Sequence, residues 1–160
     1  MVNGIHRVSV ARWFFGEVKS IYAVEHGTRA YSLDIEANVC ATLKFENGAL
    51  GEILSIPQAS HFEVFNETMV HGDAGAIVAS RTDAKVHVYG ERTDTSDNHI
   101  ALDVDEEEDH FVSEMEHFLD YVQNDTPCIC DGSSERESLA VVLGGFESIK
   151  TGAEVSCHRR

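Results

Sequence analysis

The sequence predicts an α+β domain in which helices pack on one face of a mainly antiparallel, open-faced β-sheet of about five to six strands. Three observations support this. An apolar segment near the amino terminus ends at a glycine, alternating apolar and polar residues fill the middle of the chain, and the last third changes to a helical period. Short turns rather than crossover helices join the middle strands, which favours antiparallel pairing and leaves one sheet face free for a partner.

The amino-terminal segment predicts a short helix followed by a strand. Apolar residues from Ile5 to Phe15 recur at mixed helical spacings, and Gly16 provides a stop. Residues 18–24 then alternate apolar and polar side chains and are rich in β-branched and aromatic types, as strands are. We therefore expect the chain to enter the sheet directly after its first helix.

The clearest local pattern is a β-hairpin over residues 38–56, where two alternating runs flank an Asn-Gly pair at 47–48. Because Asn-Gly tolerates positive φ at both central positions, we expect a two-residue type I′ turn. A second pair of strands is expected around a turn at residues 72–75. Residues 85–90 and 99–104 predict further strands, which completes the expected sheet.

Two amphipathic helices are expected in the last third of the chain. The first covers residues 109–124, and its apolar stripe consists of Phe111, Met115, Phe118 and Val122. The second runs from about Ser134 to Lys150, with Gly152 beyond its end. Its apolar stripe consists of Leu139, Val142, Leu143, Phe146 and Ile149.

The composition predicts one globular domain over residues 1–160, with a hydrophobic content of 42% that supports a real core. The formal net charge is -16, from 12 Lys and Arg against 28 Asp and Glu. This acidity disfavours nucleic acid as a partner, since a phosphate backbone requires a cationic surface. The four cysteines lack a disulfide-like spacing, and no apolar run reaches the roughly 20 residues that cross a bilayer, so we expect a cytoplasmic protein with no membrane contact.

Several familiar site motifs are missing from the sequence. It has no G-x-G-x-x-G or G-x-x-x-x-G-K-[ST] segment, so we expect this chain alone to bind no dinucleotide cofactor. It also lacks C-x-x-C, H-E-x-x-H and G-x-S-x-G, which disfavours zinc and serine-hydrolase sites. His110, Glu114 and His117 share a helical face that could present three metal ligands, but solvent exposure explains them without a metal. We predict no metal site and keep this triad as an alternative.

Four stretches of the sequence resemble successive motifs of one protein family. They are "GIHRVSVARWFFGEVKSIYA" at 4–23, "ATLKFENGALGEI" at 41–53, "GDAGAI" at 72–77 and "DTPCICDGSSERESLAVVLGGFESIKTGAEV" at 125–155. In this order they are similar to the G-x-H helix, the L-x-F-x-N-G-A-x-G hairpin, the G-x-x-G turn and the closing helix of the Gfo/Idh/MocA family. These are NAD(P)-dependent oxidoreductases, among them glucose-fructose oxidoreductase and inositol dehydrogenase. The resemblance is to their C-terminal domain and covers nearly the whole chain.

The resemblance implies that this chain is the substrate and oligomerisation half of a larger enzyme. Family members have an N-terminal Rossmann domain that binds NAD or NADP and carries an E-K-P segment with a catalytic lysine, and neither appears here. The full-length parent is expected to transfer a hydride at a CH–OH carbon of a small sugar or polyol, and this fragment alone is expected to be inactive. A homo-oligomer such as a dimer is expected through the open sheet face. The position of Met1, just before the histidine motif, favours truncation inside a longer reading frame.

The resemblance also assigns candidate site residues. His6 matches the G-x-H histidine, to which the family gives proton transfer or orientation of the substrate hydroxyl, and imidazole chemistry suits that step. Asn3 and Arg12 are the candidate substrate-binding residues. The family's usual aspartates before and after the histidine are replaced here by Val2 and Ser9, so the carboxylate that would fix the imidazole tautomer is missing.

Each assignment has a structural alternative. His6 could be a helix-start histidine bonded to backbone, and Arg12 could form an ion pair with the acidic surface, which is the role we favour for it. Trp13 could also reach a substrate hydroxyl, but we expect it to pack against the sheet. For the chain as a whole, the alternative is a standalone, non-catalytic oligomerisation or binding module.

Overall fold

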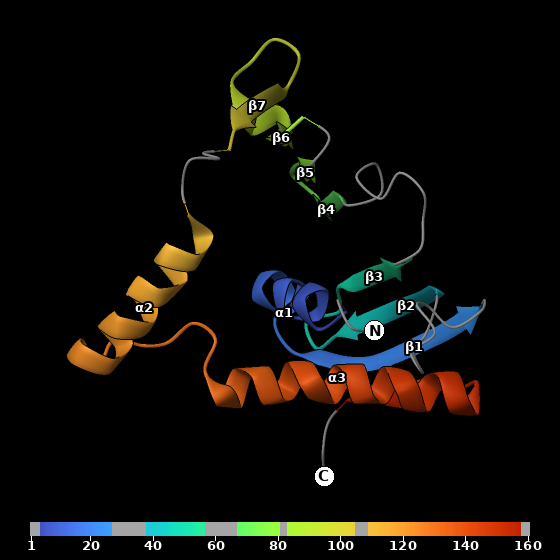
Figure 1. The fold of residues 1–160 in the computed structure, drawn as a ribbon. Coiled ribbons are helices and arrows are strands. Elements are labelled where there is room, and N and C mark those ends of the chain that lie inside the picture. Colours follow the sequence, from blue (N-terminus) through green and yellow to red (C-terminus); the bar gives the residue numbers. More distant parts are fainter. Residues whose placement is uncertain (1–3, 27–37, 57–66, 81–82, 105–108, 158–160) are drawn as a thin grey trace. The chain divides into compact units, whose positions relative to one another are not determined.

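The computed structural model describes residues 4–26, 38–56, 67–80, 83–104 and 109–157, which form two compact units (Figure 1). The first unit contains α1 (Gly4–Phe15), β1 (Val18–His26), β2 (Asn38–Phe45), β3 (Leu50–Ser55), α3 (Gly132–Thr151) and β8 (Val155–Ser156). The second unit contains β4 (Glu67–Gly72), β5 (Gly75–Ser80), β6 (Lys85–Tyr89), the 3₁₀ helix η3 (Glu91–Thr93), β7 (His99–Asp103) and α2 (His110–Asn124).

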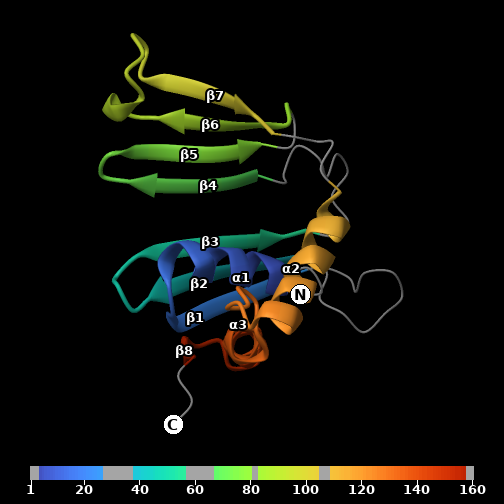
Figure 2. The ribbon, with the colours of Figure 1, turned by 90° about the vertical axis from the view of Figure 1, so that its left-hand side faces the viewer.

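Two helices cover one face of the first sheet. Its four strands are antiparallel in the order β3-β2-β1-β8, and α1 and α3 lie on the same side of them (Figure 2). The register places Ile21, Leu43 and Gly51 in one row that faces the helices, while Tyr22 and Thr42 in the next row face the other way. The core consists of Val8, Val18, Ile21, Ala23, Val39, Ala41, Leu43, Phe45, Ile53, Val141, Val142 and Cys157.

Capping residues explain where α2 and α3 begin and end. The Asp131 side chain accepts a hydrogen bond from the Ser134 backbone N–H at 2.7 Å at the start of α3, and Asp109 does the same for Phe111 at 3.0 Å in α2. At the other end of α3, Gly152 adopts a left-handed φ of 69°, which a glycine reaches without steric cost. The helix ends are therefore local properties of the sequence.

The predicted hairpin between β2 and β3 is present, but the predicted type I′ turn is wrong. Gly48 N–H donates to Phe45 O at 3.1 Å, and Phe45 N–H donates to Ala49 O at 3.0 Å, so the loop is longer than two residues. Gly48 has a φ of 90°, whereas Asn47 lacks the positive φ of a type I′ turn. Asn47 is held instead by its side chain, which accepts from Ala49 N–H at 2.9 Å and donates to Phe15 O at 3.1 Å.

The second sheet is antiparallel, in the order β4-β5-β6-β7 (Figure 2). The register gives it two chemically different faces. The predicted turn over residues 72–75 joins β4 to β5 through two central residues. The apolar face presents Val70, Ile77, Ala79, Val86, Val88, Ile100 and Leu102. The opposite, polar face presents Glu67, His71, Lys85, His87, Tyr89, His99 and Asp103.

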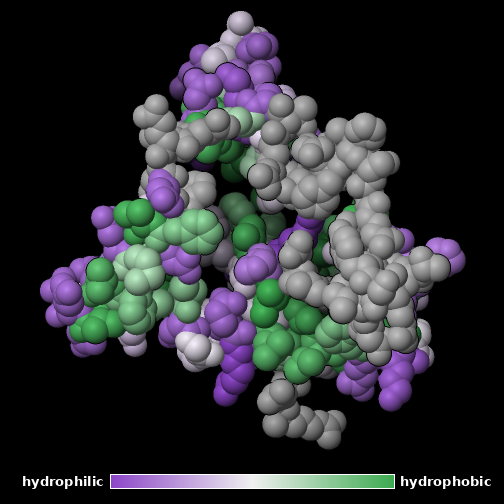
Figure 3. Space-filling view, in the orientation of Figure 1, coloured by the Kyte–Doolittle hydropathy of each residue, from purple (hydrophilic) through white to green (hydrophobic). Residues whose placement is uncertain are grey.

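The architecture confirms the predicted α+β class with antiparallel sheets. In the described residues the strands divide into two sheets of four, where one open sheet of five to six was expected, and β8 was not anticipated. Helix α2 is amphipathic as predicted, yet its apolar side chains are at the surface, as Figure 3 shows. None of the helices in the described ranges combines the length and apolar character that crossing a membrane requires.

Candidate functional site

The candidate site lies at the first turn of α1, and this helix is held firmly against the first sheet. Val8 is almost fully buried beneath the helix, and Phe15 packs on Phe45 with ring centroids 5.2 Å apart. On the β3 side, the Arg7 guanidinium donates to the Leu54 carbonyl at 3.1 Å. These contacts fix the direction of the side chains on the outer face of α1.

A polar network holds α1 on its other side, against α3. The Arg12 Nη1 donates to the Ser134 carbonyl at 2.7 Å and to the fully buried Ser138 hydroxyl at 2.8 Å. The Ser9 hydroxyl donates to the Glu135 carboxylate at 2.8 Å and lies 3.1 Å from the Ser138 hydroxyl. Because each of these groups is partly or fully removed from water, the network ties the two helices in one arrangement.

Arg12 completes this network with an ion pair to Glu17. Two nitrogens of the guanidinium contact the two carboxylate oxygens, at 2.6 Å and 3.3 Å, in the bidentate geometry that favours arginine. The side chain of Arg12 is only 8% exposed. The ion pair that we favoured for Arg12 is thus present, and its role in substrate binding stays a prediction.

His6 is exposed on the first turn of α1, at the end of the helix that the network holds. Asn3 and Val2 lie outside the described residues. Within the described part of the chain, no hydrogen bond joins His6 to Arg12, whose guanidinium is bound to α3 and Glu17 instead. An exposed imidazole on a rigid helix can exchange a proton with a group that docks against this end of α1.

The outer face of α1 continues from His6 to Val10, Trp13 and Phe14, all of which are exposed. The expectation that Trp13 packs against the sheet was wrong, because its side chain is 76% exposed and contacts the Phe14 ring edge to face at 4.9 Å. The position of Trp13 on the helix explains its exposure, since Val8 and Phe15 fill the side of the helix that faces the sheet. The result is an apolar surface beside an imidazole.

Sequence reasoning missed Glu135, Ser138 and Glu17 as partners of the candidate site. Ser9 and Glu135 are 126 residues apart, and no spacing or motif links them. Glu17 is closer, only five residues after Arg12, and a basic residue followed by an acid beyond a helix-ending glycine could have indicated that pair. The three partners position α1 rather than touch the outer face.

The alternative metal triad on α2 receives no support from the described residues. The His110 side chain is not among them, Glu114 is exposed, and no group of three or more His, Cys, Asp or Glu side chains in the described ranges is arranged to hold a metal ion. His117 does have interaction partners. Of the triad, the structure therefore describes only the exposed Glu114 and the half-buried His117.

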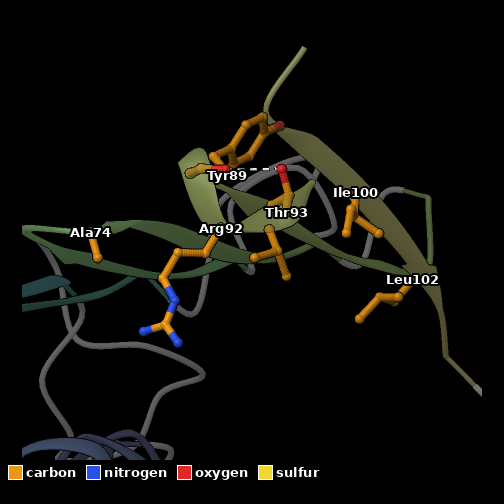
Figure 4. A pocket seen from close by; sticks show the side chains of 8 residues that line it. Ala74, Tyr89, Arg92, Thr93, Ile100 and Leu102 are labelled. Carbon is orange, nitrogen blue, oxygen red and sulfur yellow. Dashed lines mark hydrogen bonds between the residues drawn. The ribbon is translucent and has the colours of Figure 1, made fainter. Parts of the chain in front are cut away.

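A shallow cavity of about 190 Å³ lies in the second unit, on the apolar face of its sheet. Figure 4 shows the Ile100 and Leu102 side chains directed into it, Arg92 at its rim, and the Tyr89 ring turned away. The Thr93 hydroxyl donates to the Gly90 carbonyl at 2.9 Å and fixes the turn beside it. The lining carries no acid–base pair, so this cavity is not the catalytic candidate.

The sequence matches the family model for the oxidoreductase family, C-terminal alpha/beta domain, over residues 1–157. The chain is a Gfo/Idh/MocA C-terminal domain. No curated protein matches the sequence. The family match covers α1 with His6, both sheets and α3, so every element described above belongs to the matched region.

Solved structures share the fold of this Gfo/Idh/MocA domain. An aldose-aldose oxidoreductase from Caulobacter crescentus, complexed with glycerol, has a TM-score of 0.79 at 18% identity, with 96% of this chain and 45% of that chain covered. An oxidoreductase from Agrobacterium radiobacter, in complex with NAD+, L-tartaric acid and magnesium, has a TM-score of 0.78 at 20% identity, with 96% and 47% covered. The WlbA dehydrogenase from Bordetella pertussis, in complex with NADH and UDP-GlcNAcA, has a TM-score of 0.70 at 19% identity, with 99% and 44% covered. The chain therefore spans less than half the length of these proteins.

Proposed function

We propose that this domain forms the substrate side of an NAD(P)-dependent oxidoreductase that transfers a hydride at a CH–OH carbon of a small sugar or polyol. The observation that carries the proposal is the exposed His6 on a helix anchored to both β3 and α3. The chain has no dinucleotide-binding fingerprint, so its residues do not fit as the holder of the cofactor. The nicotinamide, bound by a Rossmann domain, would take up the hydride.

In this proposal, residues of this chain accept or position the proton of the substrate hydroxyl. His6 accepts the proton of the substrate hydroxyl or orients that hydroxyl, with a lysine of the Rossmann domain as the principal acceptor. Asn3 donates a hydrogen bond to substrate or to the cofactor amide. Ser9 is engaged with Glu135, so a carboxylate reaches the first turns of α1 from α3 although the family aspartates are replaced. The contacts of Arg12 support a positioning role beside its predicted substrate contact.

The proposed substrate class has indirect support. Glycerol, L-tartaric acid and UDP-GlcNAcA, named with the three similar structures, all carry hydroxyl groups on carbon. A few precisely placed polar groups fix the orientation of a small ligand in its site. An inositol dehydrogenase-like activity belongs to this class.

The test compares this chain with a version extended upstream through any contiguous reading frame. We expect only the extended protein to bind NAD(H) or NADP(H) in calorimetry and to reduce the cofactor with a sugar or polyol panel. His6→Ala should lower kcat by about 10²- to 10⁴-fold, as loss of an acid–base group does. His26→Ala, an exposed histidine at the end of β1, serves as the matched control. Equal activity of the two variants would refute the role of His6.

The alternative function, a non-catalytic oligomerisation module, has its own supporting observation. The face of the first sheet that points away from α1 and α3 carries exposed apolar side chains on two strands, with Leu50 70% and Leu54 51% exposed on β3 and Tyr22 and Val24 exposed on β1; Lys44 and Glu52 share this face. Exposed apolar side chains of this kind favour a protein partner. We propose that a second copy of the chain covers it and forms a dimer, in the enzyme as in a standalone module.

Light scattering tests this assembly. The chain should be a dimer, and the double variant Val24→Lys, Leu54→Lys should be a monomer with unchanged circular dichroism, because two like charges per copy would meet at the interface. Met69→Lys, an exposed residue of β4, is the matched control and should leave the dimer intact. A monomeric wild type would overturn the proposal.

We further propose that residues 1–160 act as one domain and that the protein is cytoplasmic. The continuous family match over residues 1–157 supports the first point. In the described residues none of the four cysteines is in a disulfide, which supports a reducing compartment.

A further inference from the structure

Two histidines and an aspartate lie together on the polar face of the second sheet, far in sequence from the candidate active site. His87 in β6 and His99 in β7 are diagonal neighbours, because Tyr89 pairs directly with His99 in the antiparallel register. The His87 Nδ1 and the His99 Nε2 are 3.1 Å apart. Their rings are nearly parallel, with an interplanar angle of 12°.

The proton positions in this cluster follow from Asp83. The Asp83 carboxylate lies 2.8 Å from the His87 Nε2. The ionised carboxylate of an aspartate has no proton to donate and only accepts hydrogen bonds. A neutral His87 ring must then carry its proton on Nε2, which leaves a lone pair on Nδ1. That lone pair points toward His99.

The His99 ring is held in place from two further directions. The Tyr89 ring stacks on it at a centroid distance of 4.6 Å and an interplanar angle of 14°. The backbone of His99 is fixed by the Thr95 hydroxyl, which accepts from the His99 N–H and donates to its carbonyl, each at 3.0 Å. These contacts hold the His99 ring next to the His87 ring.

We propose that His87 Nδ1 and His99 Nε2 form a two-imidazole site for a divalent transition-metal ion of the copper, nickel or zinc class. Two nitrogens bound to one such ion at about 2.0–2.1 Å stand about 3 Å apart, which matches their present separation. The ion takes the place of the hydrogen between them. His99 shifts its proton to Nδ1, and both rings turn so that their lone pairs converge on the ion.

Asp83 gives this pair the supporting shell that a metal site needs. A carboxylate that accepts the second N–H of a ligating histidine fixes the ring tautomer and raises the basicity of the ligand. Other charged groups on this face are engaged nearby: the Lys85 ammonium pairs with Asp103 at 2.7 Å, and Glu67 accepts a bond from Ser80 at 3.5 Å. No third ligand is in place among the described residues, so water completes the coordination. Imidazole ligands without carboxylates favour copper, nickel and zinc over magnesium or calcium.

The experiment is a calorimetric titration of the untagged chain with Cu²⁺, the divalent ion that such sites bind most tightly. Cys40, Cys128 and Cys130 are first changed to serine, because exposed or half-exposed thiols would compete for the ion. We expect one saturable site per chain and an electron paramagnetic resonance signal with two nitrogen ligands. His87→Ala and His99→Ala should each lower the affinity at least tenfold, and Asp83→Asn about 10- to 100-fold.

Two matched controls keep the test specific. His71→Ala, on the same sheet face in β4, and His117→Ala, on α2, should leave binding unchanged, and circular dichroism should confirm that every variant is folded. Binding that survives both His87→Ala and His99→Ala would overturn the proposal. Loss of binding in His117→Ala with His87→Ala unaffected would overturn it as well, and would assign the metal to α2.

Discussion

At Ser148, one hydroxyl group serves two backbone partners in the core of the first unit. Its oxygen accepts from the Ala23 N–H of β1 at 2.9 Å and donates to the Ala153 carbonyl beyond α3 at 2.6 Å. The side chain is fully buried. Because β8 is too short to reach Ala23, this hydroxyl satisfies a sheet donor that would otherwise be buried without a partner.

We predict that Ser148→Ala lowers the free energy of unfolding by about 1–3 kcal/mol, the cost of an unsatisfied buried backbone group. Urea denaturation measures this loss of unfolding free energy. Ser156→Ala, an exposed serine in β8, is the control and should change stability by less than about 0.5 kcal/mol. Equal losses in the two variants would contradict the role of the hydroxyl.

Gly75 and Gly90 make a second prediction at the scale of single residues. Their φ angles are 151° and 153°, and a Cβ at Gly75 would lie 2.0 Å from the Tyr89 carbonyl oxygen, while one at Gly90 would lie 2.5 Å from that of Ala74. Backbone atoms cannot move out of a steric clash as the end of a flexible side chain can. Gly75→Ala and Gly90→Ala should each destabilise the protein by more than about 1 kcal/mol in urea denaturation.

The control for these glycines is Gly132→Ala, at the start of α3, where an added Cβ meets nothing within 4 Å and φ is not positive. It should be neutral or slightly stabilising, since alanine favours the helix. If Gly75→Ala were as stable as this control, the close approach of the β5 and β6 backbones would not be a constraint.

At the scale of elements, helix α3 shows what periodicity predicts and what it does not. Its extent was close to the prediction, because Asp131 and Gly152 mark its ends. Its packing face differs from the prediction, because the predicted apolar stripe included Leu139, Leu143 and Phe146, which are exposed. The buried residues are mostly small ones, namely Ser138, Val141, Val142, Gly144, Gly145 and Ser148.

Close approach of α3 to β1 explains this choice of face. A Cβ at Gly144 would already lie 3.2 Å from the Ile21 side chain, so leucine and phenylalanine cannot fit between the helix and the sheet. Hydrophobic periodicity ranks residues by apolarity and cannot anticipate a packing distance. The same limit applies to the site, where the position of His6 followed from the sequence but the Ser9–Glu135 contact depends on tertiary packing.

The start of α3 also leads to a prediction about acid stability. The Ser133 hydroxyl and then the Ser134 backbone N–H donate to Asp131 and lower the pKa of its carboxyl below the ordinary 3.8. The folded state therefore holds this proton less tightly than the unfolded state. The stability that Asp131 contributes is complete above pH 3.8 and is lost as the pH falls through the lowered value.

Replacing Asp131 by asparagine keeps a capping oxygen but removes the titration. We expect the unfolding free energy of Asp131→Asn to fall less steeply than that of wild type between pH 5 and about pH 2. Urea denaturation at a series of pH values measures the slopes. The control is Asp97→Asn, which changes an exposed aspartate before β7. If its unfolding free energy fell with pH as gently as that of Asp131→Asn, the role assigned to Asp131 would be contradicted.

For the molecule as a whole, exposed apolar faces are the property that most directly concerns function. They occur on α1, on α2, on the outer side of α3 and on the free face of the first sheet. Soluble monomers rarely expose so many. A chain that covers less than half the length of its structural relatives is expected to present such surfaces to other protein surfaces.

The reactivity of the cysteine thiols measures how accessible these surfaces are. Burial raises the pKa of the Cys157 thiol to about 11, so at pH 8 this residue is both inaccessible and protonated. Cys40 lies on the free face of the first sheet, opposite Leu54, and Cys130 is exposed outside the sheets. Timed labelling with a thiol reagent and mass spectrometry should show fast reaction at Cys130 and reaction at Cys157 only when the protein unfolds.

The rate at Cys40 then distinguishes a covered sheet face from an open one. If a second copy packs on this face, the labelling rate of Cys40 should fall as protein concentration rises, while that of Cys130 stays constant, because only the dimer hides the thiol. The Val24→Lys, Leu54→Lys variant should restore fast labelling of Cys40 at every concentration. A Cys40 rate independent of concentration in the wild type would mean that the face stays open in this chain, and that its partner is a different surface.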